Sequence, residues 1–144
     1  MIKKIFLSFL FICTISIINA QEWQTDFKIA KEIASKEHKK LILVFQGSDW
    51  CGPCIKLDKE VWSQDEFKTY AKNNFVMVKV DFPKRKKNKL TAEQQEKNYQ
   101  LAEIYNKQGF LPRVIILNEN GKVLGETGYK KMTPEKYIKL LASF

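Results

Sequence analysis

Apolar residues along the chain alternate between the spacing of helices and the spacing of strands. They recur every three or four positions over residues 25–39, which predicts a helix. The runs at 41–45 and 75–80 are apolar without polar alternation, which is typical of strands buried on both faces of a sheet. Two further apolar runs, 114–117 and 122–125, flank an Asn-Gly pair and predict a β-hairpin.

Capping residues indicate where the remaining helices begin. Ser63 with Glu66, and Thr91 with Gln94, have the spacing of a capping box, and Thr133 is followed by a proline that suits the first helical position. The pattern predicts helices over residues 51–60, 63–72, 91–107 and 133–144. Because helices separate most of the strands, we expect one α/β domain with a central mixed sheet and helices on both faces.

The beginning of the chain has the pattern of a secretory signal peptide. Two lysines precede an apolar run over residues 5–18, and Ile-Asn-Ala at 18–20 resembles a cleavage site. A membrane anchor is the alternative, but this run is shorter than the roughly 18 to 20 apolar residues that cross a bilayer. We therefore expect residues 1–20, with Cys13, to be removed, and an exported or periplasmic domain of residues 21–144 without stable membrane insertion.

Composition and charge exclude several classes of protein. With 144 residues, 44% of them hydrophobic and 28% charged, the chain is neither disordered, collagen-like nor a multi-span membrane protein. The formal net charge is +9, or +7 without the signal peptide, and the most basic stretch is 84–89. This stretch has no interleaved aromatic residues, so nucleic-acid binding is not expected. We expect a solvated loop, with docking of an acidic partner as the alternative.

The candidate chemistry lies in the turn Trp50-Cys51-Gly52-Pro53-Cys54. The turn follows a predicted strand and begins a helix, so Cys51 lies where free N–H groups and the helix dipole favour a thiolate. Cys54 lies one helical turn later, which allows the Cα separation of about 4.4 to 6.8 Å that a disulfide requires. We expect Cys51 to be a nucleophile and Cys54 to be the thiol that resolves its mixed disulfides, with Pro53 suited to the first turn.

Two inert alternatives for the cysteines are weaker. A purely structural disulfide between Cys51 and Cys54 would stabilise little, because closing so short a loop hardly constrains the unfolded chain. A metal site needs about four ligands, and His38 is the only other soft candidate outside the signal peptide. We expect His38 to be solvated and no metal to be bound. Trp50 is expected to be partly a lid over the disulfide, whereas Trp23 and Trp62 are expected in the core or at its rim.

Two segments carry a family resemblance. The first is Trp50-Cys51-Gly52-Pro53-Cys54, which resembles an active-site signature. The second is Leu111-Pro112, which comes just before the predicted strand at 114–117. With the order of elements over residues 25–144, they resemble the thioredoxin superfamily. The resemblance implies that Pro112 is a cis-proline facing the cysteines and that the backbone of Leu111 binds an extended substrate. It also places Phe45 where familiar members bury an aspartate, so we expect Cys54 to lose its proton to solvent.

The resemblance implies an extracytoplasmic thiol–disulfide oxidoreductase that acts on protein thiols and disulfides without a cofactor. The Gly-Pro pair between the cysteines resembles the reducing members, so we expect reduction, a membrane electron donor and a monomer. A disulfide oxidase or isomerase is the alternative direction. A non-enzymatic adaptor or holdase that uses the Leu111–Pro112 groove, or a structural role in an assembly, are the alternatives outside enzymes.

Overall fold

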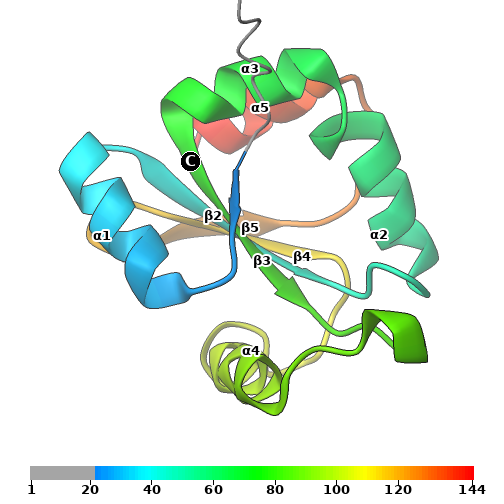
Figure 1. Ribbon diagram of the computed structural model, residues 1–144. Coiled ribbons are helices and arrows are strands. Elements are labelled where there is room, and N and C mark those ends of the chain that lie inside the picture. The colour runs from blue at the N-terminus through cyan, green and yellow to red at the C-terminus, as the bar shows by residue number, and fades with distance from the viewer. Residues whose placement is uncertain (1–21) are drawn as a thin grey trace, which may run out of the picture.

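A mixed β-sheet forms the centre of the protein, with helices on both faces (Figure 1). The computed structural model describes residues 22–144, and the predicted signal peptide at 1–20 lies outside these described residues. Within them the strands are β1 (Trp23–Gln24), β2 (Lys40–Gln46), β3 (Phe75–Asp81), β4 (Arg113–Leu117) and β5 (Val123–Thr127). The helices are α1 (Phe27–Glu37), α2 (Gly52–Leu57), α3 (Asp65–Asn74), α4 (Ala92–Tyr105) and α5 (Pro134–Ala142). The predicted α/β architecture is confirmed.

The strands lie in the order β1-β3-β2-β4-β5. Both β1 and β2 run parallel to β3, whereas β4 is antiparallel to β2 and to β5. The carboxyl ends of β2 and β3 therefore meet at one edge of the sheet, where Gln46 pairs with Asp81. The sequence pattern missed β1, because a two-residue strand has no periodicity and exists only through its pairing with β3.

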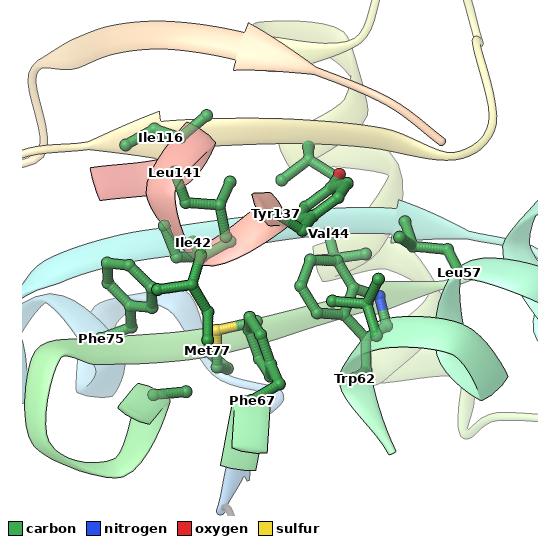
Figure 2. Packing of buried hydrophobic residues seen from close by; sticks show 14 residues of the cluster. Ile42, Val44, Leu57, Trp62, Phe67, Phe75, Met77, Ile116, Tyr137 and Leu141 are labelled. Carbon is green, nitrogen blue, oxygen red and sulfur yellow. The ribbon is translucent and has the colours of Figure 1, made fainter. Parts of the chain in front are cut away.

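Strand β2 is buried on both faces, as its unbroken apolar run predicts. Leu43 and Phe45 point into a core beneath α1 and α4, whereas Ile42 and Val44 point into a core beneath α2, α3 and α5. Figure 2 shows the second core, in which the Trp62 ring packs edge-on against that of Tyr137 with centroids 5.3 Å apart. Each fully buried large side chain stabilises the fold by about 1.5–3 kcal/mol. The two cores hold β2, and thus the turn that follows it, in a fixed position.

The predicted capping box at Ser63 and Glu66 is wrong. Beyond α2 the chain continues through a π-helical segment at Asp58–Trp62, so Ser63 ends that segment rather than beginning the next helix. Its hydroxyl donates to the Asp58 carboxylate at 3.2 Å. Helix α3 begins after Gln64, which makes no side-chain cap. Local spacing could not reveal this, because a continuing helix and a new helix share the same apolar period.

The caps of the later helices agree with the sequence in part. Thr91 and Thr133 each accept the N–H three residues ahead, which confirms the predicted starts of α4 and α5. The Gln94 side chain does not return to Thr91 as a full capping box would, but donates to the carbonyl of Thr25 at 2.9 Å. Helices α4 and α5 also end two residues earlier than predicted, within the usual spread at helix ends.

Candidate active site

The two cysteines lie at the junction of β2 and α2. Cys51 and Cys54 form a disulfide with their Cα atoms 5.2 Å apart, within the predicted range. Cys51 is the N-cap of α2, and its sulfur accepts the N–H of Cys54 at 3.3 Å. The two residues are 6% and 3% exposed in this oxidised state. Gly52 and Pro53 between them are exposed, so the turn presents its backbone to solvent beside the sulfurs.

The Leu111–Pro112 loop lies at the same edge of the sheet as the cysteine turn. The Leu111–Pro112 peptide bond is cis, which confirms the prediction. Arg113 pairs with Phe45 across β4 and β2, so Pro112 lies next to the point where β2 leaves the sheet for the cysteines. Both Leu111 and Pro112 are half-buried, and Phe110 before them is 62% exposed. The loop therefore presents the exposed apolar side chain of Phe110 on this edge.

Trp50 packs against the loop that follows β3. Its indole Nε1 donates to the carbonyl of Phe82 at 2.8 Å, and the Nζ of Lys84 lies 3.7 Å from the ring centroid. The side chain is 42% exposed. Trp50 is therefore a packing surface, as expected, while its role as a lid over the disulfide stays a prediction. Trp23 and Trp62 pack against each other at the core, as predicted.

Comparison with known proteins assigns the family. Residues 27–144 match the model of the thioredoxin-like domain. The chain belongs to this family. The disulfide bond reductase DsbH of Chlamydia pneumoniae is 34% identical over 122 residues, which cover 85% of this chain and 71% of that protein.

Two solved structures show the same relationship at the level of the fold. The structure of a DsbH oxidoreductase superposes with a TM-score of 0.78 at 32% identity, covering 86% of this chain and 83% of that one. The crystal structure of a disulphide isomerase from Xylella fastidiosa Temecula1 superposes with a TM-score of 0.60 at 25% identity, covering 81% and 86%. With its bonded Cys51–Cys54 pair, this thioredoxin-like protein is a thiol–disulfide oxidoreductase.

The position of the family's buried acid holds an apolar side chain in this thioredoxin-like protein. Phe45 is fully buried in the core beneath α1 and α4 and offers no group that could take a proton. In the sheet, Asp81 of β3 pairs with Gln46 of β2, and its carboxylate accepts both the N–H and the hydroxyl of Ser48. Loss of the Cys54 proton to solvent stays the prediction.

Asp49 is the residue at this site that sequence reasoning missed. Its carboxylate accepts the N–H groups of Lys84 and Arg85 at 2.9 and 3.0 Å and the side-chain amide of Asn88 at 2.9 Å. These bonds, the Lys84 N–H foremost, hold the pKa of Asp49 below its usual value of 3.8. The partners lie 35 to 39 residues downstream, so no local signal could have found them. The basic stretch is thus anchored beside the cysteines, although its side chains are exposed as predicted.

A second link ties the end of β5 to the π-helical segment behind the cysteines. The Tyr129 hydroxyl donates to a carboxylate oxygen of Glu60 at 2.8 Å. This bond to an acceptor, with partial burial and the negative charge of Glu60, raises the pKa of Tyr129 above 10.0. The backbone of the same segment approaches the proline loop, since a Cβ at Gly128 would lie 3.1 Å from the Pro112 carbonyl. The loop is therefore supported from β5 as well.

The other predictions for binding groups concern metals and membranes. Among residues 22–144, no cluster of three or more His, Cys, Asp or Glu side chains is arranged to hold a metal ion. His38 exposes 79% of its side chain, and its Nδ1 lies 3.0 Å from the Glu119 carboxylate, so it has a partner as well as solvent. Within the same residues, no helix is long and apolar enough to cross a bilayer.

Proposed function

We propose that this protein reduces disulfides in exported proteins, with Cys51 as the attacking thiolate and Cys54 as the resolving thiol. The bonded pair at the start of α2 is the observation that supports these roles most directly. The Cys54 N–H that already points at the Cys51 sulfur would stabilise a thiolate there after reduction. The Chlamydia pneumoniae relative is a disulfide bond reductase, which supports the reducing direction.

The proposed reaction moves two electrons from the cysteine pair to the substrate. The Cys51 thiolate attacks one sulfur of the substrate disulfide, and the other substrate sulfur leaves as a thiolate and takes up a proton. Cys54 loses its proton and attacks the Cys51 sulfur of the mixed disulfide. The second substrate thiol leaves, and the Cys51–Cys54 disulfide remains. A further dithiol must then reduce this disulfide before the next cycle.

The exposed residues around the pair support substrate binding. We propose that the substrate lies extended along Leu111, whose backbone would hydrogen-bond it as an added strand does. Pro112 would hold that segment against the sulfurs, while Trp50, Gly52 and Pro53 would form the opposite wall. The accessible backbone of the turn and the exposed Phe110 are consistent with this placement.

The proposed location follows from the first twenty residues. Their basic start, apolar run and cleavage pattern support export, which places the protein outside the reducing cytoplasm. A reductase there needs electrons from the cytoplasm, so we propose a membrane-bound dithiol protein as the donor and a monomeric reductase as its acceptor.

The reduction potential of the pair tests the proposed direction. The protein lacking residues 1–20 would be equilibrated in glutathione and dithiothreitol buffers, and free thiols counted by alkylation and mass spectrometry. A potential near about −270 mV, that of thioredoxin, is expected for a reductase. A potential near about −120 mV, that of DsbA, would instead indicate an oxidase. A Cys51–Cys54 disulfide that exchanges with neither buffer would indicate a purely structural disulfide.

Two single variants test the roles of the cysteines. Cys51→Ser is expected to reduce insulin disulfides no faster than the buffer, because the attacking thiolate is gone. Cys54→Ser is expected to stop at a mixed disulfide between Cys51 and the substrate, visible as an added mass that dithiothreitol removes. Full function in Cys51→Ser would favour the adaptor or holdase alternative. Faster reshuffling of a scrambled substrate than net reduction would favour an isomerase, as in the Xylella fastidiosa structure.

A further inference from the structure

We propose that a pocket beside Trp50 binds an acidic side chain of the substrate protein, next to the disulfide that Cys51 attacks. The proposal rests on the proposed function, because it names a feature of the disulfides that would be reduced. It assigns a role to the basic stretch 84–89, whose position the fold alone reveals.

The pocket lies directly beside the cysteine turn. It has a volume of about 200 Å³, and its walls include the rings of Trp50, Phe82 and Tyr99 and the side chains of Lys84 and Lys89. The Phe82 and Tyr99 rings pack together with centroids 5.5 Å apart. Trp50 forms one wall and immediately precedes Cys51, so the pocket can receive a side chain from the segment that carries the attacked disulfide.

The walls are held in place before any substrate arrives. Asp49 binds two backbone N–H groups of the loop, at Lys84 and Arg85, and the side chain of Asn88. The Trp50 indole binds the Phe82 carbonyl from the other side. Because the loop is already fixed on the cysteine turn, binding there loses less conformational entropy than binding to a free loop would.

The charge of the pocket favours a carboxylate. The basic stretch carries five exposed cationic side chains, those of Lys84, Arg85, Lys86, Lys87 and Lys89. Among residues 22–144, none of these side chains forms an ion pair. Lys84 lies against the Trp50 ring, which leaves its charge without a carboxylate partner. Asp81 also lines the pocket and brings one negative charge, which the two positive charges of Lys84 and Lys89 exceed. The unpaired lysines complement an acidic group brought by a partner.

The size of the pocket favours a single side chain over a whole small molecule. Small-molecule sites measure roughly 300 to 1,000 Å³, and this pocket is smaller. A glutamate or aspartate would place its methylene groups on the rings of Phe82 and Tyr99 and its carboxylate near Lys84 or Lys89. The occupant is therefore an acidic residue in a polypeptide, close in sequence to the substrate cysteine.

Paired peptides test the preference. Both peptides of a pair would contain one disulfide. They would differ at a single position, up to two residues before or after a cysteine, which is Glu in one peptide and Gln in the other. The dithiothreitol-reduced protein, freed of reductant, would be mixed with each peptide, quenched with acid and analysed by mass spectrometry. In at least one pair, the Glu peptide is expected to be reduced about tenfold faster at low salt, and the difference to shrink in about 0.5 M NaCl. Equal rates in every pair would overturn the proposal.

Lysine variants locate the preference in the pocket. Lys84→Gln with Lys89→Gln is expected to lower the ratio of the Glu-peptide rate to the Gln-peptide rate to about one, whatever the rate of the Gln peptide itself. The matched control, Lys36→Gln with Lys122→Gln, removes the same charge from the opposite end of β2, where β2 begins and β4 ends, and is expected to keep the advantage. Equal slowing of both peptides by the pocket variant would overturn the proposal, because the lysines would then act on the cysteine pair itself.

The outcomes separate this proposal from the proposed function. If the protein reduces none of the peptides, the proposed reductase activity fails. If it reduces Glu and Gln peptides at the same rate, only the acidic-substrate proposal fails. Oxidised glutathione, a small anionic disulfide, tests the kind of occupant. If the lysine variant of the pocket slows its reduction about tenfold and does not change the ratio of Glu-peptide to Gln-peptide rates, the polypeptide occupant is overturned.

Discussion

Gly47 leaves the room that the Trp50 indole occupies. A Cβ atom built on Gly47 would lie 2.5 Å from Cε2 of that ring, closer than any real contact. The Gly47 carbonyl also accepts the N–H groups of Trp50 and Cys51 at 3.2 and 2.9 Å. The turn that carries the nucleophile therefore folds back on a residue without a side chain, and the indole fills the space.

Adding one methyl group at this position tests the close approach. Gly47→Ala is expected to lower the free energy of unfolding by about 1–3 kcal/mol, because the ring or the turn must move to admit it. The displaced indole would lose its bond to the Phe82 carbonyl. Urea denaturation measures the first effect, and the tryptophan fluorescence of the folded protein reports the second.

A glycine in the same turn provides the matched control. A Cβ at Gly52 has no atom within 4 Å, so Gly52→Ala makes the same chemical change in open space and is expected to leave stability nearly unchanged. If Gly47→Ala were as stable as Gly52→Ala and kept the native fluorescence, the close approach would not constrain the turn.

At the scale of elements, the loop after β3 is fastened to the turn after β2. Asp49 contributes three hydrogen bonds to this connection, Ser48 adds two to Asp81 at the end of β3, and the Trp50 indole adds one to the Phe82 carbonyl. Such bonds satisfy backbone N–H groups that helix and sheet leave unpaired. The cysteine turn and the basic loop therefore form one rigid edge, rather than two independent loops.

The charge of Asp49 makes this connection depend on pH. Because the folded protein lowers the pKa of Asp49, the carboxylate stabilises the fold fully above its unfolded pKa near 3.8, and this stabilisation is lost as pH falls through the lower folded value. Asp49→Asn is therefore expected to unfold at less urea than the wild type at pH 6, and the two midpoints to converge toward pH 2. Urea titrations at several pH values measure the difference.

A second carboxylate variant is the control for the general effect that losing one negative charge has on stability. Glu103 on α4 is exposed, and no hydrogen bond or ion pair of its side chain is found among the described residues 22–144. Glu103→Gln is expected to follow the wild type at every pH. A gap between Asp49→Asn and the wild type that stayed constant from pH 6 to pH 2 would contradict the role of the ionised carboxylate.

At the scale of the whole molecule, the first twenty residues set the proposed destination. They are followed by the described domain, which carries the cysteine pair and the family match over residues 27–144. The +7 charge that remains after their removal is the charge with which the protein would meet its substrates. Export would thus bring a basic oxidoreductase to proteins whose disulfides form outside the cytoplasm.

Processing of the full chain tests the export. When the 144-residue chain is produced in a Gram-negative host, the protein recovered from the periplasm is expected to begin at Gln21 by intact-mass and N-terminal analysis. A chain that begins at Gln21 by construction, after an initiator methionine, is the control and should stay in the cytoplasm. A periplasmic protein that retained Met1–Ala20 would contradict cleavage, and a cytoplasmic full chain would contradict export.

The sequence by itself determined the features that depend on neighbouring residues. The apolar run of β2 predicted a strand buried on both faces, and the cysteines three residues apart predicted a disulfide at the start of a helix. The Leu111–Pro112 loop was placed through resemblance, and its cis bond is confirmed. These signals are local because helix periodicity, strand alternation and capping act over a few residues.

Only the tertiary structure decided what depends on residues far apart in the chain. Strand β1 exists through its pairing with β3, and Ser63 ends one helical segment instead of beginning another. Asp49 finds its partners 35 to 39 residues downstream, and the pocket beside Trp50 is closed by Tyr99 from α4. Such contacts arise when the packed sheet brings distant segments together, and no periodicity in the sequence records which of them will meet.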